Sequence, residues 1–248
     1  MRLKNNEEYF SYISRLKRLG QGLQKVVYYD SKLDKCIKIY HDIFDLEFYE
    51  CCNFKEEEIL RFKDCKNDTY IFSSDIILLN DRIIGYIEDK VLGETIDKIS
   101  PLYINLDNFI CAVSRVNIDI EKISNYKIKT FDVLYNIMYG NGKISIIDFD
   151  EYNFTELEYD KLLQHNKNNF NMGIKLFLVD TYFDEFVASN KYLNELYKDK
   201  NIDINLFLKS FKECINEYMD YNITNLSEAK KLLNKTKHKE SFIREYKI

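Results

Sequence analysis

The chain has 248 residues, of which 46% are hydrophobic and 31% charged, and its net charge at pH 7 is −5. This balance excludes an intrinsically disordered chain, and the interspersed charges give no sign of a nucleic-acid-binding surface. No apolar run has the length of a membrane span, and the N-terminus lacks the apolar core of a signal peptide. The six cysteines show no CxxC pairing, so we expect reduced thiols in a cytoplasmic protein, or in a host cytosol if the chain is an exported effector.

A short helix is expected over residues 4–17, and the run Gly20-Gln21-Gly22 follows it. Two glycines at spacing two, before the β-branched and aromatic run that contains Val27, predict a strand, a flexible turn and a returning strand. Such a turn brings backbone N–H groups close to phosphate oxygens, although a plain hairpin turn has the same signature. The next strand is predicted over residues 35–40 and carries Lys38.

A helix is predicted over residues 45–63, because its apolar residues recur at helical spacing. Glu56 lies inside the apolar stripe, where a carboxylate is out of place on a plain amphipathic helix. Glu57 and Glu58 are the neighbouring alternatives, and most acidic triplets of this kind form a solvated face. A functional carboxylate is therefore expected in this helix, with Glu56 as the first candidate.

Two further strands are predicted over residues 76–79 and 82–87, joined by the tight-turn dipeptide Asn80-Asp81. They complete a small antiparallel sheet of about five strands. The segment that contains Glu88, Asp89 and Val91 then leaves the sheet, and the sequence beyond Gly93 becomes helical. The chain is accordingly predicted to divide into an N-terminal domain and a mainly helical C-terminal domain, with the ranges 1–92 and 93–248.

The second half of the chain is predicted to be mostly helical. Residues 105–124 carry a nearly continuous apolar stripe that should be buried. Four more helices are predicted, over residues 155–170, 172–189, 203–220 and 225–246. Lys/Asn-rich sequence near 166–171, 190 and 199–201 is interpreted as the breaks between them.

The most informative stretch runs from Thr130 to Tyr152 and predicts a β-hairpin around Gly140-Asn141-Gly142. Asp132 precedes the hairpin, Asn136 stands at its start and Asp148 comes directly after it. Phosphoryl transfer from a nucleotide needs such a set, because one carboxylate orients the attacking hydroxyl and two oxygen ligands hold Mg²⁺. An ordinary hairpin with acidic flanks is the alternative.

Taken in order, these motifs resemble the protein-kinase-like family. The glycine turn resembles its glycine-rich loop, TFDVLYN its catalytic loop, and IIDFD the strand that ends in its metal-binding DFG. The resemblance covers about residues 15–152 and is to small atypical bacterial-type Ser/Thr kinases, with aminoglycoside and choline kinases as relatives in fold. It implies an α+β bilobal fold, with an N-terminal lobe of about five antiparallel strands and one helix and a mainly helical C-terminal lobe.

The resemblance also implies ATP and Mg²⁺ as cofactors and gives roles to individual residues. Those implied to lie around the nucleotide are Gly20, Gln21, Gly22, Val27, Lys38, Glu56, Glu88, Asp89 and Val91. Lys38 is implied to contact the phosphates while paired with Glu56, and Asp132 to orient the acceptor hydroxyl. Asn136 and Asp148 are the implied ligands of Mg²⁺.

The sequence departs from the family pattern at several positions. Lys25 stands where the third glycine of the loop is usual, and Thr130 replaces the usual histidine before Asp132. Asp132 and Asn136 are four residues apart rather than five, which puts the metal contact of the asparagine in doubt. Asp150 replaces the glycine of DFG, and there is neither an A-P-E motif nor a long activation segment.

Three functions remain open: a Ser/Thr protein kinase, a small-molecule kinase of the aminoglycoside or choline type, and a non-catalytic pseudokinase that binds partners. Retention of Lys38, Asp132 and Asp148 together favours activity. The short spacer between Gly93 and Asp132 favours a protein substrate, whereas the missing A-P-E favours a small-molecule acceptor. Without a long loop to phosphorylate, control by an activating protein partner is the expected switch.

Overall fold

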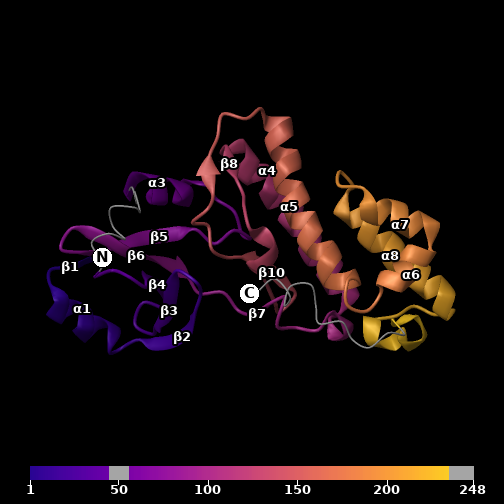
Figure 1. Cartoon of the computed structure of the whole chain (residues 1–248), viewed down its shortest axis with the longest axis horizontal. Coiled ribbons are helices and arrows are strands. Elements are labelled where there is room, and N and C mark those ends of the chain that lie inside the picture. The colour runs from indigo at the N-terminus through magenta and orange to yellow at the C-terminus, as the bar shows by residue number, and fades with distance from the viewer. Residues whose placement is uncertain (45–55, 235–248) are drawn as a thin grey trace. The chain divides into compact units, whose positions relative to one another are not determined.

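The computed structural model describes residues 1–44 and 56–234, and the chain divides into two compact units that are described separately (Figure 1). Unit 1 consists of Met1–Lys66 and Ile71–Val91, and unit 2 of Asn67–Tyr70 and Leu92–Ile248. The part of the predicted helix that falls on residues 45–55 lies outside the described residues. Within the described residues, no helix is long and apolar enough to cross a membrane.

Unit 1 is built on one six-stranded sheet with the strand order β1-β5-β6-β4-β3-β2. Its strands are β1 (Arg2–Leu3), β2 (Lys17–Gln21), β3 (Lys25–Asp30), β4 (Lys35–Tyr40), β5 (Ser73–Leu79) and β6 (Arg82–Asp89). All neighbouring pairs among β2 to β6 are antiparallel, which confirms the expected five-stranded sheet. The short β1 adds a parallel edge strand beside β5, which the sequence did not predict.

Two helices lie in the described part of unit 1. The first, α1 (Asn6–Ile13), is shorter than predicted, and Asn5 caps it by accepting a hydrogen bond from the backbone N–H of Glu8. The second, α3 (Glu56–Arg61), continues into a 3₁₀ turn, η1 (Phe62–Asp64). Ile59 and Leu60 of α3 pack on an apolar cluster that includes Ile76 of β5. This contact fixes α3 on one face of the sheet.

The strands of unit 2 form two small sheets. Three strands, β7 (Glu94–Thr95), β9 (Ile137–Gly140) and β10 (Lys143–Ile146), make one sheet, and β8 (Ile128–Lys129) pairs with β11 (Asn153–Phe154) in the other. The β9–β10 hairpin is confirmed, and its two turn residues, Asn141 and Gly142, have φ values of 51° and 70°. Both values are positive, as the tight hairpin turn requires.

The contact of β7 with β9 depends on two glycines. Gly93 has a φ of +125°, and a Cβ on Gly140 would lie 2.5 Å from the Cα of Gly93. No larger residue fits at Gly140 without moving the backbone, so β7 and β9 approach each other as only glycine allows.

Five helices complete the described part of unit 2: α4 (Leu106–Asn125), α5 (Tyr159–Val179), α6 (Asp184–Ser189), α7 (Lys191–Lys198) and α8 (Ile204–Met219). Short 3₁₀ turns lie between them, η2 (Pro101–Tyr103), η3 (Val133–Tyr135), η4 (Leu226–Glu228) and η5 (Lys230–Leu232). The two long helices, α4 and α5, pack side by side (Figure 1). Their core includes Phe109, Ile120, Phe170 and Ile174, which are all fully buried.

The prediction for the helices of unit 2 was right for α4 and α8 and wrong in three places. No break occurs near residues 166–171, because α5 runs unbroken through them. Asn166 and Asn171 are buried there and bonded to other parts of unit 2, so the polar sequence marks contacts and not a loop. A further helix, α7, was not expected, and residues 225–234 contain the turns η4 and η5 where the helix over 225–246 was predicted to begin. The rest of that predicted helix lies outside the described residues.

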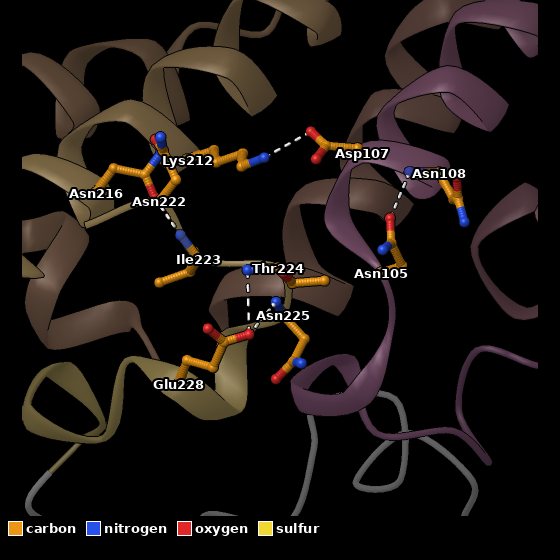
Figure 2. A network of polar contacts seen from close by, with 10 residues as sticks. All are labelled: Asn105, Asp107, Asn108, Lys212, Asn216, Asn222, Ile223, Thr224, Asn225 and Glu228. Atoms are coloured by element: carbon orange, nitrogen blue, oxygen red, sulfur yellow. Dashed lines mark hydrogen bonds and ion pairs between the residues drawn. The ribbon is translucent and has the colours of Figure 1, made fainter.

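Polar contacts tie the segment after α8 to the start of α4 (Figure 2). Lys212 of α8 pairs with Asp107 of α4, with 2.6 Å between Nζ and Oδ1. Glu228 accepts hydrogen bonds from the backbone N–H groups of Thr224 and Asn225, and Thr224 accepts one from the first residue of α4. The segment that contains Thr224 is therefore attached to the start of α4.

Candidate active site

Lys38 occupies the middle of the sheet in unit 1. Residues that face each other on neighbouring strands point to the same side of a sheet, and Lys38 lies between Val27 of β3 and Tyr86 of β6 in that way. Ile76 also faces Tyr86, so α3 covers the same face of the sheet as Lys38. The Lys38 residue is 5% exposed. A charge so deeply buried needs a specific electrostatic environment.

Glu88 supplies a carboxylate to Lys38. It lies two residues beyond Tyr86 on β6, on the same face, and its Oε2 is 3.0 Å from the Nζ of Lys38. The Glu88 residue is 2% exposed, so this is a buried ion pair between two strands of one sheet. The register of β4 and β6 therefore fixes the position of the lysine.

Glu56 does not occupy the buried position that its place in the apolar stripe predicted. It begins α3 and is exposed, as are Glu57 and Glu58. The reason is that α3 contacts the sheet through Ile59 and Leu60, nearer its other end, which leaves the first turn in solvent. Among the described residues, Lys38 forms an ion pair with Glu88, a strand carboxylate, and its pairing with Glu56 stays a prediction.

The glycine turn connects β2 with β3. Gly20 and Gln21 pair with Val27 and Val26, and the N–H of Gly22 donates to the carbonyl of Lys25 at 2.8 Å. No atom lies within 4 Å of a Cβ placed on Gly20 or Gly22. The space beside these two glycines is thus empty of protein atoms, while Val27 is half-buried on the face that carries Lys38.

Two other residues that were predicted to lie around the nucleotide, Asp89 and Val91, stand at the end of β6 and differ in exposure. The side chain of Asp89 is 67% exposed and forms an ion pair with Lys35 across β4 and β6. Val91 is half-buried just after β6. Glu88 was grouped with them among the residues around the nucleotide, and its side chain forms the ion pair with Lys38.

In unit 2, Asp132 and Asp148 lie in adjacent loops. The β8–β11 pair closes one end of these loops and the β9–β10 hairpin the other, and the N–H of Ile147 donates to the carbonyl of Asn136 at 3.0 Å. Asp132 has a φ of 50° and Asp148 a φ of 67°. Left-handed backbone is uncommon for residues other than glycine, and it recurs at functional sites.

The carboxylates of these loops influence each other. Burial, together with the charges of Glu151 and Asp148, raises the pKa of Asp132 to about 6. A cluster of like charges is stabilised by a bound cation. The electrostatics of the loops therefore suit a positively charged ligand.

Asp148 and Asn136 are oxygen donors of the kind that Mg²⁺ prefers. The amide Nδ2 of Asn136 donates to the backbone carbonyl of Asp132 at 2.9 Å, which orients the side chain with the four-residue spacing. No group of three His, Cys, Asp or Glu residues that could hold a metal occurs in the described part of the chain. Magnesium sites commonly use one or two protein oxygens together with substrate phosphates, so this donor set fits Mg²⁺.

The loop that carries Asp132 is held by α5. Asn166 is fully buried, and its Oδ1 accepts hydrogen bonds from the backbone N–H and the hydroxyl of Thr130, at 2.9 and 3.0 Å. Its Nδ2 donates to the hydroxyl of Ser124 and the carbonyl of Ile128. One amide thus connects α4, β8 and the loop. Thr130, at the position where the family pattern has a histidine, is held by this network.

Two further side chains of α5 reach the same loop. His165 and Asn169 each lie 2.9 Å from the carbonyl oxygen of Thr130 and donate to it, and the ring of Phe131 meets that of His165 edge-on. None of these α5 residues was predicted from the sequence as part of the site. Their spacing of one, three and four residues is a helical signal, but it was hidden by the predicted break.

No protein-family model matches the chain, and no curated protein matches it. Among solved structures, it resembles the kinase domain of PknI from Mycobacterium tuberculosis, in a single-mutant form, with a TM-score of 0.53. The sequence identity is 12%, and the match covers 79% of this chain and 93% of that one. The chain has a protein-kinase-like fold. A double mutant of the same domain matches with a TM-score of 0.52 and the same identity and coverage.

The kinase-like fold accounts for the order of the elements. An antiparallel sheet comes first and a helical part follows, which confirms the predicted α+β class. At 12% identity the likeness concerns the fold and carries no residue's role with it. The roles must be argued from the side chains of this chain.

Proposed function

We propose that this chain is an ATP-dependent phosphotransferase that phosphorylates serine or threonine of a protein. The observation that carries the proposal is the placing of Asp132 and Asp148 in two adjacent loops, both with left-handed backbone. Holding two carboxylates in left-handed backbone costs free energy, and such strain occurs mainly where it serves a function. Orienting a hydroxyl and holding a metal ion at the nucleotide phosphates is such a use.

Each residue has one part in the proposed reaction. Lys38, fixed by Glu88, contacts the phosphates of ATP beneath the open turn at Gly22. Asp132 orients the acceptor hydroxyl and takes its proton as the new oxygen–phosphorus bond forms and the bond to the ADP oxygen breaks. Asp148 and Asn136 would hold Mg²⁺, which would supply positive charge for the phosphate oxygens.

The acceptor is proposed to be a protein because no large insertion lies between Gly93 and Asp132, where small-molecule kinases usually carry one. A small-molecule acceptor is the second candidate. The observation in its favour is the short path from the Asp148 loop to α5, which begins at Tyr159. That path leaves little chain with which to dock a peptide.

The test is to incubate the purified chain with radiolabelled ATP and Mg²⁺, alone, with added proteins, and with small hydroxyl or amine metabolites. Label on serine or threonine supports the proposal, whereas label on a metabolite supports the second candidate. Thermal denaturation with and without Mg²⁺ and ATP tests binding separately, because a ligand of the folded state raises the melting temperature. No label and no shift would exclude a kinase and leave a binding module.

A further inference from the structure

Tyr152 is a buried tyrosine at the end of the loop that carries Asp148. Its backbone N–H donates to the carbonyl of Phe149 at 2.8 Å, and this turn brings the tyrosine back beside the start of the loop. The strand β11, which begins at the next residue, pairs with β8 just before the Asp132 loop. Tyr152 therefore stands at the junction of the two loops that make up the candidate site in unit 2.

The ring of Tyr152 is held in place by packing. The residue is 6% exposed, and its ring meets that of Tyr70 edge-on, with 6.3 Å between the ring centres. Tyr70 is also buried, and a parallel β-bridge joins it to Ile146 of β10. Aromatic packing of this kind fixes a ring and does not need a hydroxyl group on it.

The hydroxyl of Tyr152 is buried and has no hydrogen-bond partner among the described residues. Buried polar groups are usually hydrogen-bonded, because an unsatisfied one costs free energy. Burial, together with the charges of Tyr70, Asp148 and Asp132, raises the pKa of Tyr152 well above its ordinary value. Of the two carboxylates, Asp148 has the larger influence. An O–H donor without a partner thus lies close to carboxylates, which are strong acceptors for it.

A donor in this position suits a hydrogen bond that forms when the site is occupied. Asp148 is one of the oxygen donors that fit Mg²⁺, and a carboxylate that binds a metal is commonly oriented by a hydrogen bond from a neighbouring group. We propose that Tyr152 is a positioning residue, whose hydroxyl donates a hydrogen bond to the carboxylate of Asp148 when the metal site is filled. This inference rests on the metal-binding part of the proposed function.

The proposed role predicts two effects that a structural role does not combine. In the metal-free protein the hydroxyl of Tyr152 has no partner among the described residues, so its removal should not lower stability. In the metal-bound protein its removal leaves the Asp148 carboxylate without the group that orients it, so the metal should bind more weakly. A tyrosine with a purely structural role would affect stability and leave metal binding unchanged.

The test compares Tyr152→Phe with the parent full chain, with Mn²⁺ as the probe for the divalent cation. The substitution keeps the ring and its contact with Tyr70. Electron paramagnetic resonance of Mn²⁺, alone and with ADP, should show an affinity about 10- to 100-fold lower, the usual effect of losing a hydrogen bond to a metal ligand. The melting temperature without metal should be no lower than that of the parent.

Tyr139→Phe is the matched control. It removes another tyrosine hydroxyl of unit 2, on β9, where the ring packs edge-on against Phe109. The pKa of Tyr139 is raised by burial, with no contribution from a carboxylate. This variant should bind Mn²⁺ as the parent does.

The outcomes separate this inference from the proposed function. If Tyr152→Phe binds Mn²⁺ as tightly as the parent, or melts at a lower temperature without metal, Tyr152 is structural and the inference is wrong, while the proposed function stands. If the parent binds no Mn²⁺, or if Asp148→Asn binds it equally well, the inference and the metal-binding role of Asp148 are both wrong. If the parent binds Mn²⁺ in a way that depends on Tyr152 and transfers no phosphate, the inference stands and the kinase function is wrong.

Discussion

Lys38 in unit 1 and Asp132 in unit 2 are held in place by different kinds of structure. Lys38 lies within a strand, and its carboxylate partner Glu88 comes from the next strand of the same ladder. Asp132 lies in a loop whose neighbour Thr130 is held by side chains from a helix about 35 residues away. A ladder positions a side chain through its backbone register, whereas a loop needs dedicated polar contacts. Substitutions at the two places should therefore affect different properties, stability in the sheet and phosphoryl transfer in the loop.

The largest expected effect is on the stability of unit 1. Glu88→Gln removes a buried carboxylate from Lys38, and breaking such a pair typically costs about 3 to 5 kcal/mol. Asp89→Asn is the matched control, because it breaks an exposed ion pair with Lys35 on the same two strands and should cost less than about 1 kcal/mol. The measurement is urea unfolding of both variants.

The double variant Lys38→Met/Glu88→Leu sharpens this test. It removes both charges and should recover most of the stability that Glu88→Gln loses. Equal losses of stability for Glu88→Gln and Asp89→Asn would mean that the buried pair does not fix Lys38. The proposed difference between the strand ladder and the loop would then be wrong.

The next largest effect is expected on phosphoryl transfer, through the loop that carries Asp132. Asn166→Ala removes both hydrogen bonds to Thr130 and should lower phosphoryl transfer about 100-fold, because a small displacement of a catalytic group has a cost of that order. Nucleotide affinity should stay within about twofold of the parent, since Lys38 is untouched. Asn171→Ala is the control: it removes another buried amide of α5, which donates to Ile202 and does not contact the loop. Equal transfer by the two variants would show that Asn166 serves stability alone.

A smaller effect is expected at the far end of the same helix. Lys175 of α5 is buried and donates to the carbonyls of Leu196, Tyr197 and Asp199, at 3.0, 2.9 and 2.7 Å. Lys175→Met should lower the free energy of unfolding at pH 7 by about 1 to 3 kcal/mol and leave transfer unchanged. Loss of transfer in this variant would contradict the division of α5 into an end that holds the loop and an end that holds α7.

The pH dependence of that variant is a further check. Burial lowers the pKa of Lys175 to about 8, against a partly opposing effect of Asp199, while the unfolded chain has the ordinary value of 10.5. Between pH 8 and 10.5 the unfolded state binds more protons, so this lysine makes stability rise with pH in that window. The free energy of unfolding of the parent should therefore rise relative to that of Lys175→Met from pH 8 to 10. A constant difference would mean that the pKa is not lowered.

The difference between the strand ladder and the loop also explains which features could be predicted from the sequence. Strand alternation and turn dipeptides are local patterns, and they predicted the sheet around Lys38 and the hairpin between Asn136 and Asp148. The ion pair of Lys38 with Glu88 could not be predicted, because it depends on the register of β4 with β6. The helix pattern pointed to Glu56 instead, which is exposed.

The loop contacts were hidden for a related reason. The asparagines near residues 166–171 have the composition of a break, yet in α5 they face Thr130 and Ile202 and are buried. Composition does not tell a solvated polar residue from one bonded inside the protein. The long-range partner decides between them, and a single sequence does not contain it.

The most direct test of the central claim compares Asp132→Asn with the parent in phosphoryl transfer and in nucleotide binding. The substitution keeps the volume of the side chain and removes the charge that orients and deprotonates the acceptor. A positioned general base contributes about 10²- to 10⁴-fold, so transfer should fall by that factor while ATP affinity stays the same. If Asp132→Asn transfers phosphate as fast as the parent while Asp148→Asn is inactive, Asp132 is only structural and the proposed mechanism is wrong.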